Sequence, residues 1–141
     1  MRLACELRNM APRLAAGAVI VESGLSKRGA GEETATQLHG MAAGTYPVLE
    51  KVPPKTFARL LSSGEIALGT ALLLPLVPTA LAGAGLAAFS AGLLGLYLRT
   101  PGMRRPGSLR PTQAGTPLAK DIWLLGIGIG LVADVATRER R

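Results

Sequence analysis

The residue with the clearest chemical potential is Glu65, an acid inside an otherwise apolar stretch. It is the only charged residue in the segment Leu60–Leu98. Removing a carboxylate from water is costly, so Glu65 must either be neutral or have a cationic partner. Lys27 is the first candidate for that partner, and Lys120 and Arg59 are the alternatives. An acid within a membrane is by default a candidate functional residue.

The length of this apolar stretch predicts two membrane-spanning helices. A helix needs about 20 residues to cross a hydrocarbon core of about 30 Å, and the stretch offers about 40. Pro75 and Pro78 mark a turn in its middle. Shorter apolar segments on either side predict one further span each. We therefore expect four spans, at about residues 10–26, 56–76, 79–98 and 119–135.

These spans predict an all-α integral membrane protein, a single domain over residues 1–141 that forms an up-down-up-down four-helix bundle. The first long connection is expected to hold a short amphipathic helix over about 32–44, because apolar residues recur there at helical spacing. The second, 99–117, is rich in proline and arginine and is expected to be an extended basic loop. Both connections lie on the same side of the predicted bundle.

Alternating helix directions bring ionisable side chains together near that side. The interpretation of Glu65 stays open between a structural ion pair that locks the helices, a polar pocket, and a residue facing a partner protein. Such a pocket would bind a headgroup, a quinone carbonyl or a proton. The residues expected to gather there are Glu22, Lys27, Glu65, Lys120 and Asp121.

Small residues predict where the helices approach one another closely, since helices in lipid associate through close backbone contact. The third span carries a strip of small residues at four-residue spacing, and the fourth carries a GxxxG pair. Most of these contacts are expected within the chain, with homodimerisation through the third span as an alternative. The predicted packing residues are Gly24, Gly64, Gly83, Ala87, Ala91, Gly95, Gly126 and Gly130.

The composition excludes several classes of function. The net charge is +7, but the basic residues cluster at the ends of apolar segments, as in membrane proteins, so nucleic-acid binding is not expected. Cys5 is the only cysteine and His39 the only histidine, which argues against a metal site. Arginines of the second connection are candidates for contact with lipid headgroups or an acidic partner, namely Arg99, Arg104, Arg105 and Arg110.

Several short motifs resemble the DoxX family of small four-helix bacterial membrane proteins. They are Arg13-Leu-Ala-Ala-Gly17, Gly24-Leu-Ser-Lys27, Gly64-Glu65-Ile-Ala-Leu-Gly69 and Lys120-Asp121-Ile-Trp-Leu-Leu. The resemblance extends over roughly 13–134. It implies that Gly24, Lys27, Gly64 and Glu65 correspond to positions that recur in the family. The basic loop 99–117 and the helix around His39 are additions to the family pattern.

The resemblance implies a link to membrane redox complexes, because the family takes its name from a subunit of a thiosulfate:quinone oxidoreductase. We expect an accessory subunit of a quinone-linked complex, with quinone as a candidate ligand and no covalently bound cofactor. No cysteine pair, haem ligand set or metal cluster is present to carry electrons, so catalysis by this chain alone is not expected. A scaffold or assembly subunit with purely structural buried charges is the alternative. A small-molecule carrier is a third hypothesis, disfavoured by the lack of broken helices.

The expected location is the bacterial cytoplasmic membrane, with several crossings and with lipids and another membrane protein, or a second copy, as partners. The termini carry six of the 16 lysines and arginines close to span ends, whereas the other ten are spread over the long connections. This density favours termini in the cytoplasm.

Overall fold

The computed structural model describes residues 2–141, with side chains from residue 7 onward, so the side chain of Cys5 lies outside the described part. Every regular element in residues 2–141 is a helix. The elements are α1 (Arg2–Arg28), α2 (Glu32–Thr45), the 3-10 helix η1 (Pro47–Lys51), α3 (Pro54–Leu73), α4 (Thr79–Arg99), α5 (Thr116–Ala119) and α6 (Asp121–Glu139).

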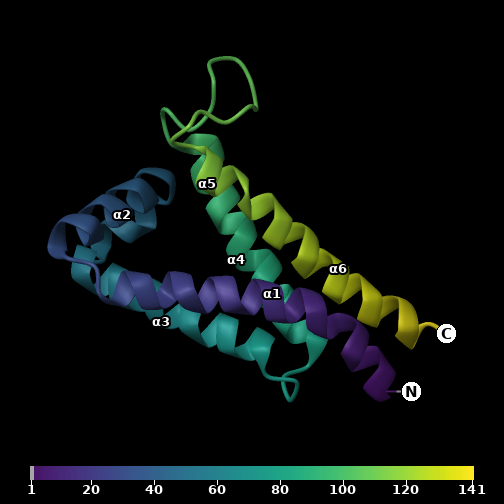
Figure 1. Cartoon of the computed structure of the whole chain (residues 1–141). Coiled ribbons are helices and arrows are strands. Elements are labelled where there is room, and N and C mark those ends of the chain that lie inside the picture. The colour runs from purple at the N-terminus through teal and green to yellow at the C-terminus, as the bar shows by residue number, and fades with distance from the viewer. Residues whose placement is uncertain (1) are drawn as a thin grey trace.

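The helices form two antiparallel pairs that converge at one end and diverge at the other (Figure 1). One is the α1–α3 pair and the other is the α4–α6 pair. The helix α2 lies beside α3 at the diverging end, and the loop between α4 and α5 projects beyond the second pair (Figure 1). The two termini lie near each other, at the converging end.

Glycines allow the backbones of α1 and α3 to touch. A Cβ atom on Gly17 would lie 2.9 Å from the carbonyl oxygen of Gly69, and one on Gly24 would lie 2.9 Å from that of Ser62. Both distances are too short for a real side chain. The hydroxyl of Ser62 also donates a 2.8 Å hydrogen bond to the carbonyl of Gly24. The pair is therefore held by backbone approach over two turns of helix.

The α4–α6 pair is built in the same way around Gly83 and Gly128. A Cβ atom on Gly128 would lie 2.7 Å from the backbone nitrogen of Ala87 and 2.8 Å from the carbonyl oxygen of Gly83. Gly24, Gly83 and Ala87 thus lie at the predicted helix contacts.

Other residues predicted to pack lie elsewhere. A side chain on Gly64, Gly126 or Gly130 would meet nothing within 4 Å, so these glycines form no helix contact within the chain. Gly69 and Gly128 occupy the contacts instead. Ala91 is exposed, and Gly95 lies against the hydroxyl of Tyr46 rather than against a helix backbone.

The hydrophobic core lies where the two pairs converge. It contains Ala16 and Ile20 of α1, Leu72 of α3, Leu86 of α4 and Leu131 of α6, all almost fully buried. This cluster is small, because all four long helices are close together over only part of their length.

A buried arginine ties the converging end together. Arg13 is completely buried, and its guanidinium donates to the carbonyls of Ala71, Leu72 and Leu74 and to the hydroxyl of Thr79, at 2.6–2.9 Å. Two of these carbonyls belong to the last turn of α3. Carbonyls in the last turn of a helix have no N–H groups of a following turn to accept from. Arg13 therefore caps α3 and fixes the turn into α4.

A second polar contact joins the ends of α1 and α6. The carboxylate of Asp134 pairs with Arg8, accepts a 3.1 Å hydrogen bond from Asn9, and pairs with Arg138 at 3.1 Å. The N-terminal part of α1 thus crosses to the α4–α6 pair, whereas its remainder packs on α3.

The prediction of four membrane spans was wrong. Within the described residues, only Thr79–Arg99 is long and apolar enough to cross a membrane, judged by length and composition. The other helices are interrupted by charge. In α3 the apolar part from Leu60 to its end at Leu73 covers about 14 residues, or about 21 Å at 1.5 Å per residue. The uncharged part of α6, between Asp121 and Asp134, is shorter still.

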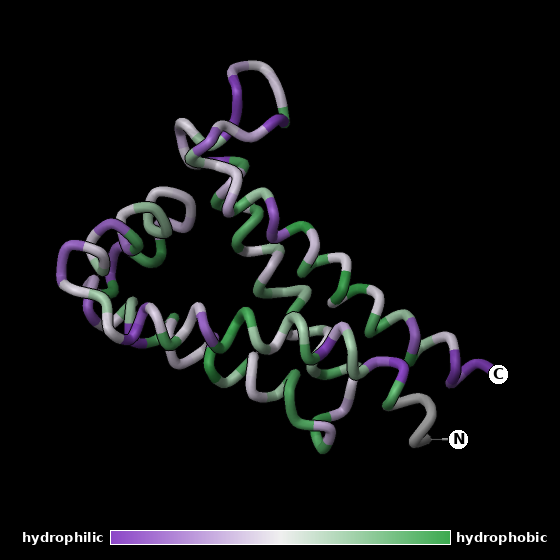
Figure 2. Tube along the Cα trace, viewed as in Figure 1, coloured by the Kyte–Doolittle hydropathy of each residue, from purple (hydrophilic) through white to green (hydrophobic). Residues whose placement is uncertain are grey.

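The arrangement also differs from an up-down-up-down bundle, because α3 and α4 diverge after their short turn instead of packing along their length (Figure 1). The segment expected to be a short helix, 32–44, forms α2, which buries Ala35, Ala42 and Ala43. The segment 99–117 is irregular up to α5, with Gly102 and Gly107 at positive φ where it turns. Figure 2 shows hydrophilic residues in this loop and hydrophobic ones along α4.

Candidate functional site

A cavity of about 590 Å³ lies between the diverging helix pairs. Residues from α1, α2, α3, α4, α5 and α6 all contribute to its wall. It therefore exists because the two pairs separate beyond the core and because α2 and α5 flank the space between them, which stays partly open. This volume lies within the range of sites that bind small organic molecules, about 300–1,000 Å³.

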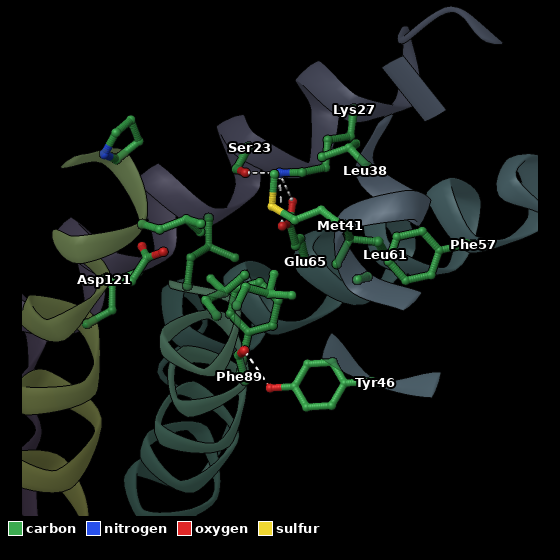
Figure 3. Close-up of a pocket in the computed structure, with 18 of the residues that line it drawn as sticks. Ser23, Lys27, Leu38, Met41, Tyr46, Phe57, Leu61, Glu65, Phe89 and Asp121 are labelled. Carbon is green, nitrogen blue, oxygen red and sulfur yellow. Dashed lines mark hydrogen bonds and ion pairs between the residues drawn. The ribbon is translucent and has the colours of Figure 1, made fainter. Parts of the chain in front are cut away.

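One wall of the cavity carries a charged group made by α1 and α3. The Lys27 ammonium lies 3.0 Å from one carboxylate oxygen of Glu65 and 3.1 Å from the other. It also donates a 2.5 Å hydrogen bond to the hydroxyl of Ser23, one turn earlier in α1. Figure 3 shows these three side chains gathered on the same side.

The close approach of α1 and α3 explains why this group can form. Lys27 follows the Gly24 contact by one turn, and Glu65 follows Ser62, which bonds to Gly24, by one turn. Residues three or four apart lie on the same face of a helix, so both charges project from the seam of the pair into the cavity. The Glu65 side chain is only 3% exposed, and Lys27 neutralises it.

The opposite wall carries a second acid, Asp121, at the first turn of α6. Figure 3 shows its carboxylate facing the cavity across from Ser23, Lys27 and Glu65. The pKa of Asp121 is raised from its ordinary 3.8 to about 6, mainly by burial; the nearby charge of Lys27 lowers this pKa and the charge of Glu65 raises it. In the described part of the chain, no side chain forms a hydrogen bond or close ion pair with this carboxylate.

The rest of the lining is almost entirely apolar. It includes the aromatic rings of Phe57 and Phe89, with aliphatic side chains such as Leu61 between them. Tyr46, after α2, reaches α4 and donates a 2.7 Å hydrogen bond to the carbonyl of Gly92. This bond joins the α2 side of the cavity to the α4 side. The site can therefore enclose an apolar body and present hydrogen-bonding groups at two places.

Two of the residues expected in the site lie outside it. Glu22 and Lys120 are exposed and do not line the cavity. Each is next in sequence to a lining residue, Ser23 or Asp121, but projects from a different face of its helix. Arg59, an alternative partner for Glu65, is also exposed and lines a separate depression.

The arginines of the second connection also lie outside the cavity. Arg99, Arg105 and Arg110 are exposed. The guanidinium of Arg104 donates to the carbonyls of Leu98 and Ser108, so it shapes the loop. His39 bonds through its Nε2 to the carbonyl of Leu49, and its ring lies edge-on to Phe57 at 5.7 Å. It is therefore a packing residue behind the cavity.

Sequence reasoning missed Ser23 and Tyr46 as parts of the site. Ser23 lies four residues before Lys27, a spacing that places both on one helix face and could have indicated the contact. Tyr46 gives no comparable signal, because its partner is a backbone carbonyl 46 residues away.

Among the described residues, no three His, Cys, Asp or Glu side chains are grouped in a way that could hold a metal ion. Comparison with protein-family models, with curated proteins and with solved structures found no match to this chain. The resemblance to the DoxX family therefore stays a prediction from the sequence motifs.

Proposed function

We propose that this protein binds a lipophilic small molecule in the cavity, and that it serves as a non-catalytic accessory subunit of a quinone-linked membrane redox complex. The observation that carries the proposal is the composition of the cavity wall. An apolar enclosure with a few polar groups at fixed places is typical of sites for small organic ligands. The link to a redox complex comes from the DoxX-like motifs.

A quinone has the chemistry that such a site accepts. Its carbonyl oxygens accept hydrogen bonds, and its ring and tail are apolar. On one wall the hydroxyl of Ser23 accepts from Lys27 and can still donate its own hydrogen, and on the other wall Asp121 is a donor when protonated. Phe57 and Phe89 offer aromatic surface for the ring.

The proposal includes association with the bacterial cytoplasmic membrane through α4. The core helix of a water-soluble protein can be equally long and apolar, but such a helix is mostly buried. In α4 only 28% of the apolar window is buried within the chain. The remaining apolar surface, including Leu81 and Leu98, is exposed in the isolated chain and favours contact with lipid or another protein. Whether the termini face the cytoplasm stays a prediction.

A scaffold role is the second candidate, and the contact between Lys27 and Glu65 favours it. The ion pair joins α1 to α3 and would stabilise their pairing without any ligand. In this case the protein would contribute surfaces to a complex, and the cavity would have no occupant of its own.

Ligand binding distinguishes the two candidates. The purified protein in a neutral detergent would be titrated with decylubiquinone by calorimetry. Leu61→Trp places a large side chain in the cavity, whereas Leu60→Trp, its neighbour, points outward, with Leu60 62% exposed. We expect Leu61→Trp to lose binding and Leu60→Trp to retain it. Equal binding by all three proteins, or by none, would contradict the quinone proposal.

Activity in the complex provides a second test. Glu65→Gln keeps the shape of the side chain but removes its charge. If the variant is stably folded and loses partner-linked quinone reduction, the cavity is the functional site. If it loses only folding or assembly, the scaffold role is favoured. Glu22→Gln, an exposed acid on α1, is the matched control.

A further inference from the structure

The charges that line the cavity do not balance. Three charged residues contribute to its wall: Lys27 from α1, Glu65 from α3 and Asp121 from α6. The helices α2, α4 and α5 contribute apolar residues, and Tyr46, which follows α2, contributes its phenol, but none of them contributes a charge. Lys27 is committed to Glu65, with both carboxylate oxygens within 3.1 Å. Asp121 is therefore a surplus acid.

The ammonium of Lys27 has little capacity left for an incoming anion. It has three N–H donors, and its contacts with Glu65 and Ser23 use them. An anionic headgroup would have to displace Glu65 and would also face Asp121. A cationic headgroup would meet a carboxylate with no hydrogen-bond partner in the described part of the chain.

The aromatic part of the lining suits the apolar body of a ligand. Phe57 of α3, Phe89 of α4 and Tyr46, which follows α2, all line the cavity. Their rings offer apolar surface away from Asp121 (Figure 3). Apolar walls and a surplus acid together form the surroundings that an ammonium group on an apolar body requires.

We propose that the cavity binds lipophilic organic cations, with the ammonium group beside Asp121 and the apolar body between the helix pairs. This inference rests on the cavity of the proposed function but does not depend on quinone as its ligand. It assigns Asp121 the role of selecting for positive charge. The ion pair of Lys27 and Glu65 stabilises the opposite wall of the cavity.

Three probes with the same decyl chain test the selection by charge: decyltrimethylammonium, decanol and decanesulfonate. Each keeps its charge at every pH used, so only the protein titrates. Binding would be measured by calorimetry in neutral micelles, with protein-free micelles subtracted. At about pH 8 we expect the cation to bind roughly tenfold more tightly than decanol, and the sulfonate to bind more weakly than decanol. At about pH 5, where Asp121 is mostly protonated, the advantage of the cation should fall to about threefold or less.

Substitution localises the effect. Asp121→Asn should abolish the preference for the cation at about pH 8, and Glu22→Gln should leave it unchanged. If Asp121→Asn does not fold, the pH dependence of the unmodified protein still decides. A cation that binds no better than decanol at about pH 8, or an advantage that persists at about pH 5, would overturn the inference.

The outcomes also separate this inference from the proposed function. Binding of decylubiquinone without a preference for the cation would refute only the inference about charge. Binding of the cation without binding of decylubiquinone would refute only the quinone proposal. If no probe binds, both fail and the scaffold role remains.

Discussion

Replacement of Arg13 by methionine should strongly destabilise the protein. The guanidinium is completely buried and donates to the carbonyls of Ala71, Leu72 and Leu74 and to the hydroxyl of Thr79. Methionine keeps most of the side-chain length but provides no donor. The buried carbonyls at the end of α3 would then lose their partners, and the turn into α4 would lose its anchor.

The magnitude follows from the balance of two effects. A hydrogen bond from a charged donor contributes about 1.5–3 kcal/mol, so the loss of several would cost more than any single bond. The removal of a buried charge recovers part of that cost, because its desolvation penalty also disappears. We therefore expect Arg13→Met to lower the free energy of unfolding by about 3–5 kcal/mol. Arg13→Lys keeps the charge but loses the planar fork, and should cost about half as much.

Arg8 on the same helix is the matched control. Its side chain is 63% exposed, and its partner Asp134 also pairs with Arg138. Arg8→Met should therefore cost less than about 1 kcal/mol. All variants would be unfolded by urea in neutral detergent and followed by circular dichroism. If Arg13→Met and Arg8→Met differed by less than about 0.5 kcal/mol, the capping role of Arg13 would be refuted.

Three further predictions concern stability in the same assay. Gly128→Ala should cost about 2–3 kcal/mol by pushing α4 and α6 apart, whereas Gly126→Ala should stabilise the helix by about 0.5–1 kcal/mol, and the reverse order would refute the helix register. The raised pKa of Asp121 means that the folded state binds the proton more tightly than the unfolded state does. The unmodified protein should therefore lose stability as the pH rises from about 4 to about 6. Asp121→Asn should remove this loss, gaining up to about 1 kcal/mol at about pH 8, and an unchanged pH profile would count against it. Glu65→Gln should cost about 2 kcal/mol by leaving Lys27 unpaired, against about 0.5 kcal/mol or less for Glu22→Gln.

The contact between Glu65 and Lys27 could be predicted from the sequence because a charge in an apolar segment has few possible partners. Their positions along the helices place both residues toward the same end of the fold. Because an unpaired buried charge is costly, the two residues are then expected to form an ion pair. The positions of Glu22 and Lys120 outside the cavity could not be predicted in this way. Each differs from a cavity residue by one position, and one position rotates a side chain by about 100° around the helix.

The predicted number of spans was wrong because the length of an apolar stretch does not show where its helices begin and end. The helix α3 starts at Pro54, and its first two turns carry Lys55 and Arg59. The turn at Leu74–Pro78 then uses apolar residues that a membrane span would need. Hydropathy alone does not separate a long apolar run from two shorter apolar faces joined by an apolar turn.

Helix register was the other feature beyond the reach of the sequence. Gly126, Gly128 and Gly130 alternate along α6, so the GxxxG spacing of the outer two competes with the central one. The choice depends on Leu131, which must enter the core, and this requirement turns Gly128 rather than its neighbours toward α4. A decision of this kind requires knowledge of the partner helix.

Arg13 and Glu65 are both buried charges, and the different partners that they find explain how the site is built. A buried charge requires partners whatever its sign, and an arginine can find them in the free carbonyls at a helix end. Arg13 thereby closes the two helix pairs at one end, while Lys27 and Glu65 neutralise each other within one pair at the other end. The space left between the pairs is bounded by Asp121 on the second pair. A ligand that touches both walls would consequently link two parts of the fold that the core joins only at their converging end.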